Sequence, residues 1–304
     1  MTRRRSAGVE VNGIILLDKP QGLTSNAALQ RVKRLFNARK AGHTGSLDPL
    51  ATGMLPLCLG EATKMSAFLL EADKRYEVTI QLGVTTNTGD AEGEVTSRSD
   101  VPPLTVDGVE SLLARFRGPQ SQTPPMHSAI KVNGQPLYKL ARAGQEVARE
   151  SREIIIHSLE LISIEGDRLS LSVLCSKGTY IRTLAEDLGA ALGCGGHVLA
   201  LRRTAVGPFR DEPMVTLDTL ERVAAEDPAA LPQFLLPSET AIAGWPGVKV
   251  SNDLAFFLCR GQPVFVPQSP TQGWVRIYRD DNRFIGVGRI MDDGRVSPKR
   301  LLKS

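Results

Sequence analysis

One carboxylate, Asp48, lies in the part of the chain whose residue types are best suited to chemistry, residues 41–55. Gly45 and Gly53 flank it, and Pro49 follows it directly. Glycine allows backbone angles that other residues resist, while proline fixes its own φ and favours an extended conformation in the residue before it. Gly, Asp and Pro also form ordinary turns. A carboxylate framed in this way is aimed by the backbone, so Asp48 is a candidate nucleophile or base.

The composition limits which chemistry Asp48 can support. The four cysteines and four histidines are dispersed and lack zinc-ligand spacing, and no glycine-rich phosphate-binding motif is present. We therefore expect neither a metal nor a cofactor. The net charge of +4 is compatible with a polyanionic partner without requiring one.

Length and hydropathy indicate a globular protein. The chain has 304 residues, which is long enough for two domains, and its charged fraction of 23% is ordinary for such a protein. It contains no run of 18 apolar residues that could cross a membrane. The basic residues 3–5 precede no apolar segment of signal-peptide length. These features predict a cytoplasmic protein with no membrane association.

The elements around Asp48 follow from periodicity. The sequence predicts a buried strand over 13–17, a helix capped by Thr24 or Ser25, a helix over 60–71 and a strand beginning at Lys74. The first helix carries a basic face, which the sequence alone leaves open between a solvated surface and a track for phosphates.

The remaining elements include both strands and helices. The sequence predicts a surface loop over 85–103, a helix around 109–116, an irregular segment over 118–136, strands over 153–164 and 168–176, a helix from Ile181 ended by Gly193, an apolar and then basic segment over 196–204, and a helix after Thr216. Short strands over 264–267, 274–278 and 284–288 follow a Pro-rich stretch over 226–247.

Residues 42–55, which read Gly-His-Thr-Gly-Ser-Leu-Asp-Pro-Leu-Ala-Thr-Gly-Met-Leu, resemble the catalytic signature of pseudouridine synthases of the TruB family. Residues 74–77, Lys-Arg-Tyr-Glu, resemble a second motif of that family. Residues 177–182, Lys-Gly-Thr-Tyr-Ile-Arg, resemble a third, and residues 196–204 resemble a further segment. The resemblance covers roughly residues 12–215 and continues, with a weaker match, from residue 248 to the end.

The resemblance implies roles for individual residues. The implied catalytic residues are Asp48, Arg182 and Tyr76, with the arginine facing the aspartate. The residues implied to contact the substrate are His43, Tyr76, Tyr180, Leu201 and Lys64. A stacking role for a tyrosine has a physical rationale because every base presents a π-face. For Leu201, a place in the core of a strand stays an equal alternative.

The resemblance also implies an architecture. It predicts an α+β catalytic domain over residues 10–245, built on a mixed or antiparallel sheet with flanking helices. It predicts a second domain over 248–304, a small β-barrel-like module of the PUA type that binds RNA. Another small barrel would give a similar pattern of short strands and turns.

The implied function is isomerisation of a uridine in the T stem-loop of tRNA to pseudouridine, by a monomer that needs no protein partner. Exchanging a C1′–N1 bond for a C1′–C5 bond requires no energy source. Two alternatives keep the basic segments: a non-catalytic RNA-binding protein or tRNA-folding chaperone, and a guide-RNA-dependent pseudouridine synthase. A glycosidase needs a second carboxylate near Asp48, and the sequence shows no obvious one. Whether Asp48 attacks the sugar or the uracil ring stays open.

Overall fold

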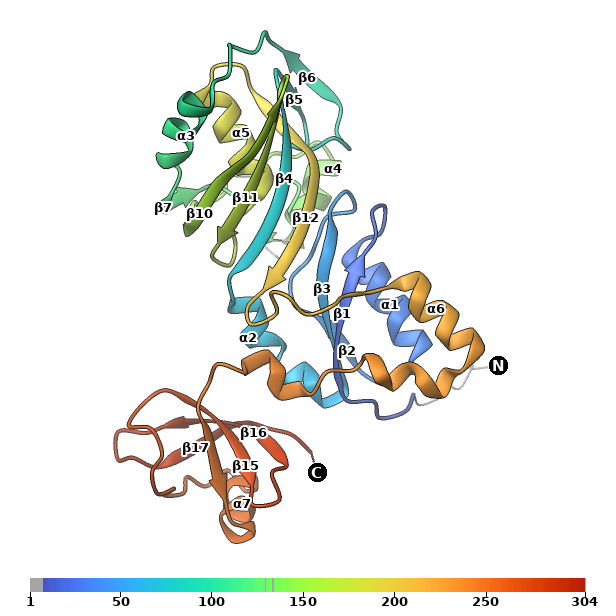
Figure 1. Ribbon diagram of the computed structural model, residues 1–304, viewed down its shortest axis with the longest axis vertical. Helices are drawn as coiled ribbons and strands as arrows, with labels where there is room; N and C mark the ends of the chain where they lie inside the picture. The colour runs from blue at the N-terminus through green and yellow to red at the C-terminus, as the bar shows by residue number, and fades with distance from the viewer. Residues whose placement is uncertain (1–7, 129, 133, 304) are drawn as a thin grey trace.

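The computed structural model describes residues 8–128, 130–132 and 134–303. Its longest dimension runs through an upper region containing α3 (Val106–Ala114) and α5 (Ile181–Ala191), a middle region containing α1 (Ser25–Leu35) and α6 (Leu217–Glu226), and a lower region near the C-terminus (Figure 1). One large sheet runs through the upper and middle regions, and a separate small sheet forms the lower one.

The large sheet has nine strands and is mixed, with the order β13-β1-β3-β12-β4-β11-β10-β7 and with β2 paired to β3. The strands are β1 (Gly13–Lys19), β2 (Ala41–His43), β3 (Thr52–Leu59), β4 (Lys74–Leu82), β7 (Gly118–Gln122), β10 (Arg152–Glu165), β11 (Arg168–Cys175), β12 (Gly196–Val206) and β13 (Val215–Thr216). Together with its helices, this sheet confirms the predicted α+β class.

The sheet consists of two halves that meet at β12. This strand pairs antiparallel with β4 along most of its length, whereas it pairs parallel with β3 at only two positions, Arg202↔Thr52 and Arg203↔Gly53. We call this region, where β3, β12 and β4 lie side by side, the half-sheet junction. The loop that carries Asp48 enters β3 at the junction, so the candidate site lies where the two halves meet.

The helices cover the sheet as their apolar stripes require. Helix α1 begins after Thr24, whose hydroxyl accepts a hydrogen bond from the Ala27 N–H, and it buries Ala28, Leu29 and Val32. It packs beside α6 on the N-terminal half, while α3 and α5 contact the other half. Strand β4 alternates as predicted, with alternate side chains from Tyr76 to Leu82 in the main core.

Three predicted segments differ in the structure. The helix over 60–71 is divided into a 3₁₀ turn, η1 (Gly60–Lys64), and a short helix, α2 (Ser66–Glu71). The predicted loop over 85–103 contains a two-stranded hairpin, β5 (Val84–Thr86) with β6 (Val95–Arg98). The first part of the predicted irregular segment is β7, which forms an edge of the large sheet because β10 is long enough to pair with it.

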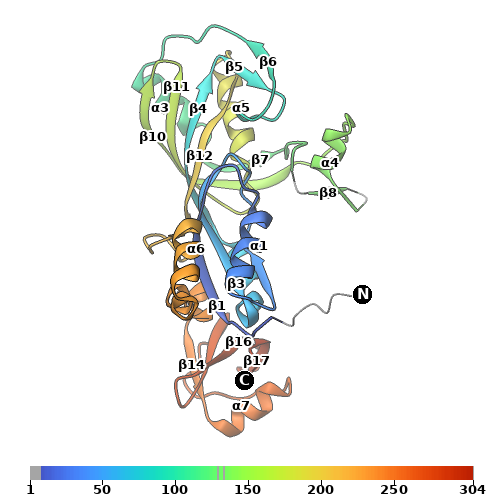
Figure 2. The same ribbon diagram turned by 90° about the vertical axis from the view of Figure 1, so that its right-hand side faces the viewer.

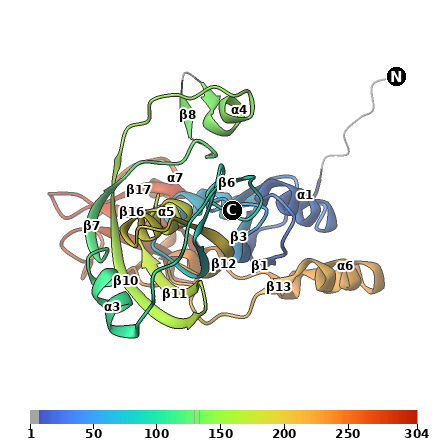
Figure 3. The ribbon, with the colours of Figure 1, turned by 90° about the horizontal axis from the view of Figure 1, so that it is seen from above.

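The described residues 123–128, 130–132 and 134–151 project away from the body of the sheet (Figure 2). They include the two-residue strands β8 (Lys131–Val132) and β9 (Gln135–Pro136) and the helix α4 (Leu137–Arg142). Seen from above, α4 and α6 extend from the molecule in different directions (Figure 3). The projection returns to the sheet at β10, which pairs with β7, and within its described residues β8 pairs with β9.

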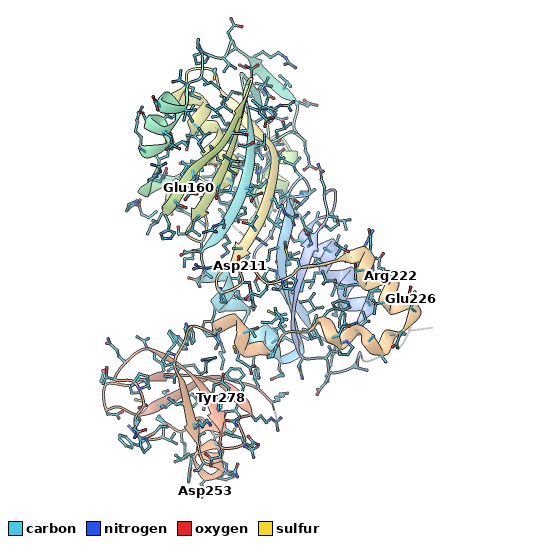
Figure 4. All side chains as sticks on the ribbon, in the orientation of Figure 1. Glu160, Asp211, Arg222, Glu226, Asp253 and Tyr278 are labelled. Carbon is cyan, nitrogen blue, oxygen red and sulfur yellow. The ribbon has the colours of Figure 1, made fainter. Side chains whose placement is uncertain are left out.

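The C-terminal region is a sheet domain with the order β14-β15-β16-β17. The strands are β14 (Gly247–Val250), β15 (Trp274–Arg279), β16 (Phe284–Ile290) and β17 (Val296–Leu301). The predicted strand over 264–267 is wrong, since only Val264 bridges to Val296 there. Helix α7 (Asn252–Cys259), capped by the Ser251 side chain, was not predicted. Figure 4 shows Tyr278 on this domain.

The C-terminal domain shares a hydrophobic cluster with the large sheet. Ile14 and Leu16 of β1 pack in one cluster with Phe284 and Val287 of β16. The two sheets therefore bury apolar surface against each other, and the predicted boundary between residues 245 and 248 stays a prediction. Among the described residues, no helix is long and apolar enough to cross a membrane.

Candidate active site

The loop that carries Asp48 is fixed to its surroundings on both sides of that residue. The Ser25 hydroxyl accepts a hydrogen bond from the Leu47 N–H at 2.7 Å and lies 3.0 Å from the Leu47 carbonyl, to which it can donate. The Pro49 carbonyl accepts from the Gly22 N–H and from the Lys19 ammonium. These contacts support the expectation that the backbone, rather than a mobile loop, determines where Asp48 points.

Arg182 faces Asp48 from the other half of the sheet. Its side chain is 6% exposed, and its Nε lies 3.0 Å from the nearer Asp48 carboxylate oxygen. Its two terminal nitrogens donate to the carbonyls of Thr88 and His127. One guanidinium thus connects the Asp48 loop, the loop after β5 and the base of the projecting segment, which fixes its orientation towards the carboxylate.

A second carboxylate, Asp90, lies behind Arg182. It is 4% exposed, and one of its oxygens is 3.7 Å from the Arg182 Nε. The other oxygen accepts hydrogen bonds from the Thr88 hydroxyl and the Glu92 N–H. A buried carboxylate needs such partners because an unpaired charge in the interior is costly. Arg182 therefore lies between two carboxylates, the buried Asp90 and the half-exposed Asp48.

Burial and the neighbouring cations shift the pKa of the Asp48 carboxyl in opposite directions. Loss of solvent raises the pKa of the Asp48 carboxyl above its ordinary value, and the nearby Asp90 charge raises it further, while Arg182 and Lys19 lower it. Burial also lowers the pKa of Lys19 to about 8, although the Asp48 charge acts against this. Arg182 therefore offsets only part of the effect of burial on Asp48.

Two tyrosines lie near this charged group. Tyr76 is 9% exposed on β4, where burial raises the pKa of its hydroxyl and the nearby Arg203 guanidinium lowers it. Tyr180 is the residue before α5, and the side-chain amide of Gln122 accepts from its N–H and donates to its carbonyl. The pKa of the Tyr180 hydroxyl is raised by burial. Both phenols therefore stay neutral at physiological pH.

His43 and Leu201 also lie at the half-sheet junction. His43 ends β2, and its buried Nδ1 has no hydrogen-bond partner among the described residues. Burial, and secondarily the Arg203 charge, lower the pKa of His43. Leu201 pairs with Val78 on β4 and packs against the main core cluster. It also lines a cavity of about 430 Å³ that does not include Asp48 or Tyr76.

Lys64 lies apart from the other predicted site residues. Its ammonium is 2.5 Å from a Glu61 carboxylate oxygen and donates to the Leu301 carbonyl at 2.6 Å. It belongs to η1, at the opposite end of β3 from the Asp48 loop. Eight residues of strand at about 3.3 Å each span roughly 25 Å. The structure thus places Lys64 at the contact with β17, and its role towards a substrate stays a prediction.

Sequence reasoning did not identify three buried charged residues of this site: Lys19, Asp90 and Arg203. Lys19 ends an apolar strand and looks like the first residue of a turn. Asp90 lies among Thr, Asn and Gly residues that indicate a surface loop. Arg203 lies in a basic run. The one usable signal was the position of Lys19 at the end of a buried strand, where its neighbours bring it into the interior.

This arrangement suits covalent or base catalysis by a carboxylate. Asp48 is half-exposed, so a substrate can reach it, while Arg182 is almost fully buried beside it. Tyr76 and Tyr180 provide two aromatic rings near the same group. Among the described residues, no group of three His, Cys, Asp or Glu side chains could hold a metal ion. The expected absence of a metal stays a prediction.

The class of protein follows from the fold together with this site. The chain superposes on a chain of the crystal structure of a Cbf5-Nop10-Gar1 complex with a TM-score of 0.71 and 26% identity, covering 96% of this chain and 84% of that one. It also superposes on a chain of an H/ACA RNP bound to a substrate RNA containing 2′-deoxyuridine, with a TM-score of 0.73, 25% identity, and coverage of 96% and 85%. The fold is the pseudouridine synthase fold.

The family "TruB family pseudouridylate synthase (N terminal domain)" matches residues 33–181, "tRNA pseudouridylate synthase B C-terminal domain" matches 182–243, and "Pseudouridine synthase II TruB, C-terminal" matches 246–302. A relative from Nitrosococcus oceani named tRNA pseudouridine synthase B is 57% identical over 99% of this chain and 98% of its own. A relative of the same name from Pseudomonas aeruginosa is 56% identical over 97% of both chains.

The chain belongs to the TruB family of pseudouridine synthases. Pseudouridine synthases are isomerases, so the chain is an enzyme of that class. The resemblance inferred from the Asp48, Tyr76 and Arg182 motifs is thereby confirmed at the level of the family.

Proposed function

We propose that this protein isomerises a uridine in the T stem-loop of tRNA to pseudouridine, with Asp48 as the reacting carboxylate. The observation that carries the proposal is the 3.0 Å pair between Asp48 and the buried Arg182, in a loop fixed on both sides. The relatives named tRNA pseudouridine synthase B, at 56% and 57% identity, support tRNA as the substrate.

The proposed reaction exchanges one bond of the same nucleotide for another. The C1′–N1 bond breaks and a C1′–C5 bond forms, C5 loses its hydrogen as a proton, and N1 gains a proton. Atoms and electrons therefore balance without an oxidant or an energy source. Asp48 serves either as a nucleophile or as a base in this scheme, and a carboxylate is chemically able to do both. Either role requires the ionised form, which Arg182 and Lys19 favour.

A uridine inside a folded loop must leave its stack before Asp48 can reach it, at a cost of a few kcal/mol. Tyr76 and Tyr180 offer aromatic faces that compensate part of that cost, since stacking of a base on an aromatic ring contributes about 1–3 kcal/mol. We assign His43, which belongs to the same motif as Asp48, to the space that the extruded base vacates. The family resemblance assigns Leu201 to the apolar side of the base pocket, while the cavity that Leu201 lines in the structure does not include Asp48 or Tyr76.

We further propose that the protein acts alone, as a monomer in the cytoplasm. The two relatives named tRNA pseudouridine synthase B align over nearly their whole length with this chain. One structural neighbour belongs to a complex of Cbf5 with Nop10 and Gar1, but that chain is only 26% identical. A guide-RNA-dependent enzyme is therefore the less favoured alternative.

The test uses a tRNA transcript whose uridines carry tritium at C5, because that hydrogen is released only when C5 becomes bonded to C1′. We expect about one tritium released per tRNA, and no release from a transcript in which cytidine replaces the target uridine of the T loop. Release from the second transcript would contradict the T-loop assignment. Absence of release from both, with tRNA still bound, would favour the chaperone alternative.

The role of Asp48 is tested with Asp48→Asn, which keeps the shape of the side chain and removes its charge. We expect tritium release to fall by at least about 10³-fold, as when a reacting group is removed from other enzymes, while tRNA affinity changes little. Asp211→Asn is the matched control, because Asp211 is an exposed carboxylate between β12 and β13 (Figure 4). Substantial turnover by Asp48→Asn would exclude Asp48 as the reacting group.

A further inference from the structure

Arg203 is a buried arginine whose side chain reaches both ends of the Asp48 loop. It is 1% exposed on β12 and is among the largest fully buried side chains described. Its Nε donates to the Met54 carbonyl at 2.7 Å, and one terminal nitrogen donates to the Gly45 carbonyl at 3.1 Å. Gly45 precedes Asp48 by three residues and Met54 follows it by six. One guanidinium therefore closes the loop at its base.

The backbone of Arg203 is fixed from two sides, so the bridge starts from a rigid point. Arg203 pairs with Gly53 on β3 and with Tyr76 on β4, the two strands that meet β12 at the half-sheet junction. At Gly53, φ is +94°, and an added Cβ would lie 2.3 Å from the Arg203 carbonyl oxygen. The two strands approach so closely there that only glycine fits.

The burial of the Arg203 guanidinium is not explained by pairing with an opposite charge. Within the described part of the chain, no ion pair joins Arg203 to a carboxylate; its guanidinium donates instead to the two backbone carbonyls and lies close to the neutral Tyr76 hydroxyl. Burying a cation is costly, and an apolar side chain of similar length would generally contribute as much stability. What an arginine adds at this position is a planar fork that can hold two carbonyls at once.

We propose that Arg203 is a positioning residue of the catalytic loop, whose guanidinium holds the Gly45 and Met54 carbonyls together and thereby fixes where Asp48 meets the substrate. This inference rests on the proposed role of Asp48. It differs from the roles of Arg182, which contacts Asp48 directly, and of Lys19, which holds the Pro49 carbonyl within the loop.

Two substitutions separate the geometry of Arg203 from its charge. Arg203→Lys keeps the charge but can hold only one of the two carbonyls in the same plane, while Arg203→Met removes the whole guanidinium, and with it the charge, and keeps an apolar stem. If the bridge matters, both variants should isomerise bound tRNA about 10–100-fold more slowly, since a displacement of about 1 Å can reduce a rate by about 10². If only the charge matters, Arg203→Lys should react at nearly the original rate.

The measurements are the single-turnover rate at saturating protein, the tRNA dissociation constant, and hydrogen exchange of the peptide covering residues 44–54. We expect exchange in that peptide to increase selectively, with tRNA affinity within about threefold of the original. Arg117→Lys is the matched control, because Arg117 also donates twice to one carbonyl, that of Leu159, far from the loop. It should leave the rate and the exchange of residues 44–54 unchanged.

Several results would overturn the proposal. A folded Arg203→Lys with normal rate and normal exchange would show that the bridge is dispensable. A failure of Arg203→Lys to fold, or a general increase of exchange over β4 and β11, would make Arg203 a core residue of the sheet. Asp48→Asn is measured in parallel. If it keeps its turnover, the proposed function of this site fails, whereas normal Arg203 variants beside an inactive Asp48→Asn contradict only the bridge.

Discussion

The chain joins separate parts of its fold in two places, and the two contacts are built from different chemistry. At the half-sheet junction, the charged side chains of Lys19, Arg182 and Arg203 are buried and donate to backbone carbonyls. At the contact with the C-terminal domain, Trp245 and Trp274 stack on each other, with ring centroids 5.3 Å apart, and Phe68 packs against both.

The difference reflects what each contact must specify. Apolar packing is non-directional and scales with the area removed from water, so it holds two bodies together without fixing individual atoms. Hydrogen bonds from buried cations have strict geometry and are costly when unmade. A junction built from them defines atomic positions at the expense of stability. The half-sheet junction is therefore where function is expected to be sensitive, and the aromatic contact is where stability is expected to be sensitive.

The largest expected effect is that of Arg182→Lys on the rate. A lysine ammonium cannot reach Asp48, the Thr88 carbonyl and the His127 carbonyl in the plane that the guanidinium provides. We expect single-turnover isomerisation to fall about 10³-fold, equivalent to about 4 kcal/mol. Arg222→Lys, on the exposed pair with Glu226 of α6 (Figure 4), should leave the rate unchanged. If Arg182→Lys slows the reaction only a few-fold, the half-sheet junction is not the contact at which function is most sensitive.

The next largest expected effect is that of Trp274→Ala on stability. Removing this half-buried ring takes one of their two aromatic neighbours from Phe68 and from Trp245, so the free energy of unfolding should fall by about 3 kcal/mol. The isomerisation rate of bound tRNA should stay within about threefold, since the described members of this cluster do not include Asp48, Arg182 or Tyr76. Chemical denaturation measures the first quantity. Phe265→Ala, which removes a ring that is 64% exposed in the same domain, is the control.

The sequence predicted the apolar architecture and the motif residues better than it predicted the buried charges. Strands β1, β4, β10 and β11 follow from runs and alternation of apolar residues, and α1 follows from its stripe and its cap at Thr24. These signals are local, so they can be read without knowing the fold. Asp48, Tyr76, Tyr180 and Arg182 were identified from motifs. The resemblance implied that Arg182 faces Asp48, but the motifs did not give the contacts that hold the two residues in place.

The residues that were missed depend on contacts between distant segments. Lys19 is buried because Leu23 and Pro49 present carbonyls to it, and Asp90 because the Thr88 hydroxyl and the Glu92 N–H satisfy it. Helix α7 was missed because its run of Leu and Phe lacks a clear stripe. The predicted strand at Val264 fails because Pro263 and Pro267 remove backbone donors on both sides of it.

The smallest expected effect on the rate is that of Asp90→Asn. The direction in which this substitution shifts the acidic limb of the pH–rate profile distinguishes two roles for the buried Asp90 carboxylate. The proposed reaction needs Asp48 ionised, so the rate is lost as the pH falls through the raised pKa of Asp48. The Asp90 charge raises the pKa of Asp48. Removing that charge should therefore move the acidic limb of the pH–rate profile to lower pH.

The rate of Asp90→Asn at neutral pH should fall by about tenfold or less, because the 3.7 Å contact with Arg182 is longer than a strong hydrogen bond. Single-turnover rates across the acidic range measure both quantities, and Asp211→Asn should reproduce the original profile. If the limb moves to higher pH instead, Asp90 acts mainly by holding Arg182 against Asp48, because Arg182 lowers the pKa of that carboxyl. In that case orientation at the half-sheet junction has a larger effect on Asp48 than the direct repulsion between the two carboxylates.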